Sequence, residues 1–138
     1  MKLLTNNPRV LHSDQFPKNV EIQFVETDYL GVLHEVSKEV IENKCRLLTH
    51  PLSSSLKPNE TYYKSVLLQD TSSSQIDLES LEMIERAIMD TEKFLASKKT
   101  PEWTERVLND FQVIDYSIIQ GALEHSAFAD YALKVDDE

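Results

Sequence analysis

The sequence predicts an α/β protein: a single-domain sandwich with a small, mostly parallel sheet of about four strands, resembling half of a Rossmann fold, and two long C-terminal helices. Two observations lead to this prediction. Short β-rich segments alternate with helical patterns as far as Leu68, and helical periodicity then fills the rest of the chain. With 138 residues, of which 41% are hydrophobic, the chain is long enough to bury one core.

Four strands and two helices are predicted in the first half of the chain. Pro8 suits the first turn of a helix, and Thr27 or Asp28 caps the start of the next helix. Asn43, in the left-handed backbone conformation, is expected to end this second helix. The predicted elements are a strand at 2–5, a short helix at 8–12, a strand at 20–25, a helix at 30–41, and strands at 45–49 and 63–68.

Two longer helices are predicted in the second half. Asp77 caps the first of them, and Thr100 caps the second, with Pro101 in its first turn. Trp103 falls in the apolar stripe of this last helix, so we expect it in the core. We divide the chain into an α/β domain at 1–119 and a helical extension with an acidic tail at 120–138.

Composition and charge exclude several classes of protein. The net charge of −10 argues against general nucleic-acid binding, which needs a clustered positive surface. No apolar run reaches the roughly 18 residues of a membrane helix, and no apolar leader follows Met1. The lone Cys45 fits a reducing compartment, so we predict a cytoplasmic protein that binds neither membranes nor nucleic acid.

Several motifs that would identify a cofactor or a reaction are absent. Only Gly31 and Gly121 are glycines, so the chain contains neither GxxxxGK[ST] nor GxGxxG, and it lacks the GxSxG of a nucleophile elbow. The four histidines and Cys45 have no metal-ligand spacing. We therefore expect no cofactor and no metal.

Polar side chains follow three of the predicted strands, at Thr5-Asn6-Asn7, Glu26-Thr27-Asp28 and 49–53. The carboxyl ends of parallel strands share one edge of a sheet, where α/β proteins bind ligands. The segment 44–65 also carries a net charge of +3, which would attract a small anion or an acidic partner. The predicted ligand-binding residues are Thr5, Asn6, Asn7, Thr49, His50, Ser53, Ser55, Lys57, Asn59 and Lys64.

Each of these residues also has a purely structural interpretation. His50 suits a general acid/base in a polar loop, but its ring could instead bond a backbone carbonyl and shape the turn before Pro51. Serine, proline and asparagine are common in any turn, and scattered lysines often only balance their neighbours. The sequence leaves these alternatives open.

Three stretches of the chain, LLTNNPRV, CRLLTHPLSSSLKPNETYYKS and IDLESLEMIERA with the later TPEW, resemble the GrdX-like family over roughly residues 1–118. The chain departs from the family pattern at Ser54, where the family has Gly, and at Tyr62, where it has Pro. The resemblance implies a small protein encoded beside the glycine reductase genes of amino-acid-fermenting anaerobes. It implies an accessory role, with glycine reductase components as possible partners, and no catalytic residues.

Three functions remain open at this point. The first is a non-catalytic accessory protein that binds a small anionic ligand or a protein partner at the carboxyl-end edge of the sheet. The second is an enzyme acting on a small phosphorylated or carboxylated metabolite, with His50 as acid/base and Lys57 holding the anion. The third is a scaffold or homo-oligomer formed through the C-terminal helices, with contacts from Ala127, Phe128, Tyr131 and Leu133.

Overall fold

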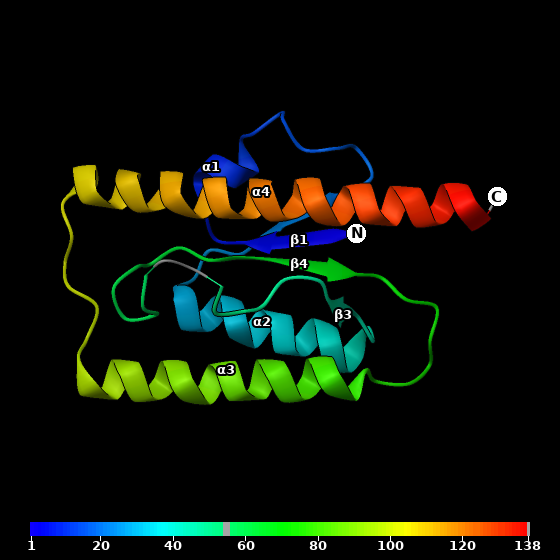
Figure 1. Cartoon of the computed structure of the whole chain (residues 1–138). Helices are drawn as coiled ribbons and strands as arrows, with labels where there is room; N and C mark the ends of the chain where they lie inside the picture. Colours follow the sequence, from blue (N-terminus) through cyan, green and yellow to red (C-terminus); the bar gives the residue numbers. More distant parts are fainter. Residues whose placement is uncertain (54–55, 138) are drawn as a thin grey trace.

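A four-stranded sheet lies between helices in the computed structural model, which describes residues 1–53 and 56–137, with side chains described up to Glu124. Helices α1 (Pro8–Leu11) and α4 (Glu105–Asp137) cover one face of the sheet. Helix α2 (Tyr29–Glu42) covers the other face, and α3 (Leu78–Ser97) packs on the outside of α2 (Figure 1). The α/β class, the four strands and the two long C-terminal helices are confirmed.

The sheet is mixed, which corrects the prediction of a mostly parallel sheet. Its strands β1 (Lys2–Thr5), β2 (Glu21–Phe24), β3 (Arg46–Leu47) and β4 (Ser65–Gln69) lie in the order β2-β1-β4-β3. Only β1 and β2 pair in parallel, because β4 enters between β1 and β3 in the opposite direction. The described part of the connection from β3 to β4, residues 48–53 and 56–64, contains no helix of the kind that a parallel crossover uses.

Three of the four strands nevertheless point the same way. Strand β3 is antiparallel to β4, and β4 is antiparallel to β1, so β1, β2 and β3 share one direction. The carboxyl ends of β1 and β2 therefore lie at one edge of the sheet, together with the first residues of β4. The chain that follows β3 runs toward the same edge, with Leu48 and Thr49 still bonded to Leu67. We call this the carboxyl-end edge.

The central strands are apolar on both faces because helices cover both faces. Leu4, Val66 and Leu68 pack with α2 and α3 on one side. Leu3 and Leu67 pack with α1 and α4 on the other. These five side chains are fully buried, and the alternation of neighbouring residues divides them between two core clusters.

The ends of α2 and α3 agree closely with the sequence. Asp28 caps α2 by accepting a hydrogen bond from the Gly31 amide at 2.8 Å, and Asp77 caps α3 through the Ser80 amide. The stop after α2 differs from the prediction. Asn43 has φ −102° and is not left-handed, whereas the next residue, Lys44, has φ 57°.

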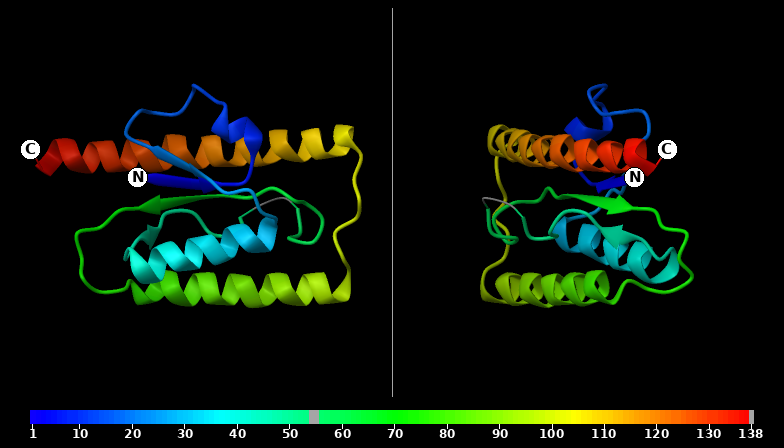
Figure 2. Two further views of the ribbon diagram at one scale, coloured as in Figure 1. Left: turned by 180° about the vertical axis from the view of Figure 1, so that it is seen from behind. Right: turned by 45° about the vertical axis from the view of Figure 1, so that its right-hand side comes forward.

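Helix α4 begins later than predicted. Its first turn is capped by Thr104, whose hydroxyl accepts from the Val107 amide at 3.3 Å, so the capping role falls to Thr104 rather than Thr100. Helices α3 and α4 lie on opposite sides of the molecule, and the residues between them cross its whole height in extended form (Figure 2). Trp103 belongs to this crossing, half-buried, with its indole N–H donating to the Glu60 carbonyl. It does not lie in the helical stripe.

Helix α4 continues without a break past the predicted boundary at residues 119 and 120. Ile119 and Leu123 are both buried in the same core cluster, 2% and 3% exposed. The division at this point stays a prediction. Within the described part of the chain, no helix is both long and apolar enough to cross a membrane. The apolar residues proposed for subunit contacts lie outside the described side chains: Ala127, Phe128, Tyr131 and Leu133.

Candidate functional site

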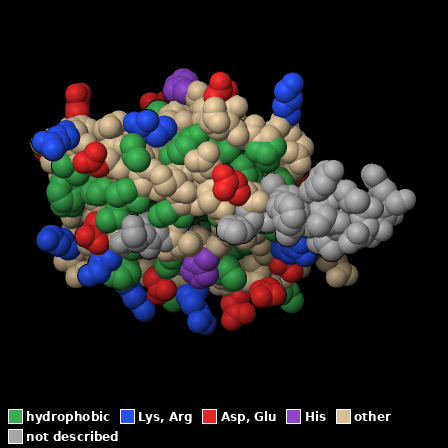
Figure 3. All heavy atoms as spheres, turned by 45° about the horizontal axis from the view of Figure 1, so that its top comes forward, with side chains coloured by type: hydrophobic (Ala, Val, Ile, Leu, Met, Phe, Trp, Pro, Cys, Tyr) green, Lys and Arg blue, Asp and Glu red, His purple; other side chains and the backbone are tan. Residues whose placement is uncertain are grey.

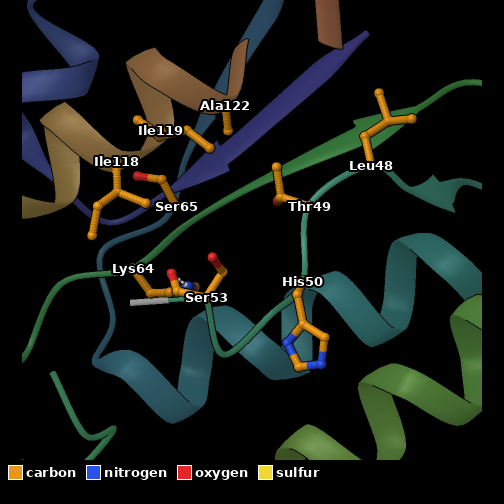
Figure 4. A pocket seen from close by; sticks show the side chains of 9 residues that line it. All are labelled: Leu48, Thr49, His50, Ser53, Lys64, Ser65, Ile118, Ile119 and Ala122. Atoms are coloured by element: carbon orange, nitrogen blue, oxygen red, sulfur yellow. Dashed lines mark hydrogen bonds between the residues drawn. The ribbon is translucent and has the colours of Figure 1, made fainter. Parts of the chain in front are cut away.

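A pocket of about 260 Å³ opens at the carboxyl-end edge of the sheet, beneath α4. One side of it comes from the connection between β3 and β4 and from the start of β4; the other side comes from α4 (Figure 4). Four of the predicted site residues line it. The complete lining is Leu48, Thr49, His50, Ser53, Lys64, Ser65, Ile118, Ile119 and Ala122.

Lys64 is the cation of this pocket. It is 3% exposed, its Nζ donates to the Ser53 carbonyl at 2.8 Å, and it lies 5.9 Å from the centre of the Tyr29 ring. Among the described side chains, no carboxylate lies within ion-pair distance of it. Burial lowers the pKa of Lys64 to about 8, against the opposing charge of Asp115.

Asp115 attaches α4 to the carboxyl-end edge. Its carboxylate accepts from the Ser65 amide at 3.0 Å, from the Ser65 hydroxyl at 2.7 Å and from the Asn7 side-chain amide at 3.0 Å. Thr5 extends this network through a 2.7 Å hydrogen bond between its hydroxyl and that of Ser65. Burial raises the pKa of Asp115, although these hydrogen bonds and the charge of Lys64 lower it.

Asp115 and Ser65 were both missed from the sequence. The signal for Asp115 was its spacing, because it follows Phe111 by four residues and precedes Ile118 by three. An acid on the apolar side of a helix must bond to polar groups there. Ser65 carried no such signal, since it reads only as the first residue of a strand.

The two asparagines that follow β1 connect neighbouring segments at the carboxyl-end edge. The Asn6 side chain donates to the carbonyls of Thr27 and Tyr62, both at 2.8 Å, and accepts from the Lys64 amide. Asn7 caps α1 and donates to the Gln112 carbonyl at 2.9 Å. Their side chains are occupied by these bonds, and neither residue lines the pocket.

His50 and Thr49 line the pocket, and each also bonds to the backbone. The His50 ring accepts from the Leu52 amide through Nδ1 at 3.0 Å, and it is turned away from the α4 side chains (Figure 4). The Thr49 hydroxyl accepts from the Leu67 amide at 3.0 Å and so extends the pairing of β3 with β4. The His50 ring thus bonds a backbone amide in this turn, where the structural interpretation expected a backbone carbonyl.

Two predicted residues of the same loop, Lys57 and Asn59, do not line the pocket. Lys57 is exposed, and its backbone amide donates to the Glu60 carboxylate at 3.0 Å. Asn59 is buried elsewhere, with its side-chain amide on the Lys98 carbonyl at 3.1 Å. Ser55 lies outside the described residues.

Among the side chains that the structure describes, no group of three or more His, Cys, Asp or Glu is placed to hold a metal ion. On the face toward α4, charged side chains of both signs are scattered around the outline rather than gathered in one positive area (Figure 3).

Comparison with known proteins places the chain in a family. The model of the family described as GrdX-like protein matches residues 2–124. Neither the comparison with curated proteins nor the comparison with solved structures found a match. The chain therefore belongs to the GrdX-like family, and this membership suggests a protein associated with glycine reductase.

Proposed function

We propose that this protein is a non-catalytic accessory protein of a glycine reductase system that binds a small anion in the pocket beneath α4. One observation carries the proposal: Lys64 is a buried ammonium in a pocket with only part of its bonding satisfied. An ammonium has three donors, and the described structure pairs one of them, with the Ser53 carbonyl. Buried lysines are rare unless they are paired, and an anion in the pocket supplies the missing partner.

The polar groups around Lys64 favour binding over catalysis. The Ser65 hydroxyl donates to Asp115, and Nδ1 of His50 is occupied by the Leu52 amide. A general base must have a free acceptor within reach of the proton that it removes. Neither Nδ1 of His50 nor the Ser65 hydroxyl is placed for that role toward a ligand on Lys64.

Thermal unfolding with and without small anions tests this proposal. Acetate and inorganic phosphate are added in turn to the wild-type protein and to Lys64→Met. A ligand at a hundred times its Kd stabilises the wild type by about 2.7 kcal/mol, a shift of several degrees for a chain of this length. We expect at least one anion to raise the Tm of the wild type, and we expect Lys64→Met to lose that shift.

Lys57→Met is the matched control, since it removes the same charge from an exposed lysine outside the pocket. It should keep the full response. An equal shift in Lys64→Met would place the bound anion elsewhere on the protein. No shift with any anion would contradict the proposal and favour a protein partner at the same edge.

A further inference from the structure

The pocket has two chemically different sides. The Lys64 ammonium is its cation, and it approaches from the start of β4 and the loop that precedes it. The α4 side opposite is apolar and consists of Ile118, Ile119 and Ala122, which point toward the strand (Figure 4). Leu48 adds a further apolar group from the β3 end. A ligand that fills this pocket must therefore be charged at one end and apolar at the other.

The charges beside the pocket favour a ligand with a single negative charge. Asp115 lies beside the pocket, because its carboxylate accepts from the amide and the hydroxyl of Ser65, which lines the pocket next to Lys64. With one lysine and one carboxylate already at this place, a monoanion adds less uncompensated negative charge than a dianion does. The second charge of a dianion would lie near Asp115 and be repelled by it.

In the part of the loop that the structure describes, the backbone amides next to Lys64 do not form a phosphate cradle. Such sites use several free backbone N–H groups that point at one anion. The amide of Ser53 donates to the His50 carbonyl, the amide of Lys64 to the Asn6 side chain, and the amide of Ser65 to Asp115. These three amides are unavailable to an anion, so Lys64 is its main donor.

We propose, building on the anion-binding function above, that the ligand is a short-chain aliphatic monocarboxylate. Its carboxylate would accept from the Lys64 ammonium, and its alkyl group would lie against Ile118, Ile119 and Ala122 on α4. The volume of about 260 Å³ accommodates an acid of a few carbons. Binding of such an acid satisfies the buried ammonium and removes apolar surface from water at the same time.

A series of straight-chain acids tests the ligand class. The Kd values of acetate, propionate, butyrate and inorganic phosphate are measured by calorimetry with the full-length wild type and with Lys64→Met. Each added methylene should tighten binding about fourfold up to butyrate, as its transfer from water predicts. Butyrate should bind at least tenfold more tightly than phosphate, and Lys64→Met should lose the binding.

The apolar side is tested by filling it. Ala122→Leu extends a larger side chain from α4 into the pocket, and leucine is a strong helix former, so the helix is retained. We expect this substitution to raise the Kd of butyrate at least tenfold and the Kd of acetate by no more than about twofold. Ala96→Leu, the same change at an exposed position of α3, is the matched control and should bind both acids like the wild type.

The outcomes separate the two proposals. Tighter binding of phosphate than of any acid, still dependent on Lys64, would overturn the monocarboxylate and leave the anion-binding function standing. Equal Kd values along the acid series, or no effect of Ala122→Leu on butyrate, would also overturn it. If neither the acids nor phosphate bind in a way that depends on Lys64, both proposals are wrong.

Discussion

At the scale of single residues, the environment of Lys64 is unfavourable to its charged form. Its ammonium is buried with one hydrogen bond and a ring contact as compensation. The fall of its pKa from 10.5 to about 8 corresponds to a cost of roughly 3 kcal/mol for the charged form. Residues kept at such a cost are commonly functional, because stability and activity then make opposite demands on one position.

Replacing this lysine should therefore stabilise the free protein. Lys64→Met keeps a long flexible side chain, removes the buried charge and leaves the Ser53 carbonyl to bond with water. We expect its free energy of unfolding at pH 7, measured by urea titration, to exceed that of the wild type by about 2 kcal/mol. A marked loss of stability would mean that the lysine serves the fold, and the case for a ligand would weaken.

The sign of the pH dependence follows from the same pKa. Below pH 8 the lysine is charged in both the folded and the unfolded chain, so the wild type bears the full cost of burial. Between pH 8 and 10.5 the folded state releases a proton that the unfolded state keeps, and the wild type gains stability as the pH rises. The advantage of Lys64→Met should shrink over this range.

Other groups make the folded state less stable as the pH rises over the same range. Only the difference in stability between the wild type and Lys64→Met is therefore informative. Burial raises the pKa of the Cys45 thiol from 9.0 to about 11 and also raises that of the Tyr29 hydroxyl. Each of these raised pKa values stabilises the folded state at low pH, and this stabilisation is lost as the pH rises. Both are present in the variant, and subtraction removes most of their contribution.

The sequence could place Lys64 in a polar segment, but it could not separate this residue from Lys57. Both belong to one polar segment with a positive net charge. Their difference arises from tertiary contacts: Tyr29 and Ser53 enclose one side chain, while the other stays exposed. The same holds for His50, whose bond to the Leu52 amide depends on the exact path of the turn.

At the scale of elements, α4 forms one side of the pocket, and Asp115 fixes its position. Asp115→Ala would leave the amide and the hydroxyl of Ser65 without their acceptor, and it would remove one of the two acceptors of the Asn7 side chain. We expect the free energy of unfolding to fall by at least about 2 kcal/mol, the cost of leaving buried donors unpaired. Urea titration measures this loss.

Asp110→Ala is the control for this prediction. It makes the same change on the same helix at an exposed position, and it should alter stability by less than about 0.5 kcal/mol. Similar losses in the two variants would show that the helix responds to the removal of any acid. The hydrogen bonds of Asp115 would then not be the cause.

Local sequence determines most of the elements, but not how they pair. The caps at Asp28 and Asp77 follow from residues within a few positions of each helix start. The direction of β4 depends instead on how the connection from β3 returns to the sheet, which no local pattern records. The expected convergence of polar loops still holds, because β3 points the same way as β1 and β2.

At the scale of the whole molecule, the open question is where the folded unit ends. The sequence placed the boundary after Ile119, whereas the family match extends to residue 124. Leu123 lies between these two limits and is buried in the cluster formed by Leu3, Val10 and Ile119. A chain that stops at residue 119 would lose this contact and would leave Ile119 in a fraying last turn.

Two truncated proteins decide between these limits. The chain 1–124 should unfold in urea with the stability of the full chain, since it keeps every buried side chain that the structure describes. The chain 1–119 should be less stable by about 2–3 kcal/mol, the value of burying one leucine side chain. Equal stability of 1–119 and 1–124 would instead favour a domain that ends at residue 119. The chain 1–124 also tests the scaffold alternative, through its mass in solution. If it forms a complex with the same number of subunits as the full chain, residues 125–138 are excluded as the interface.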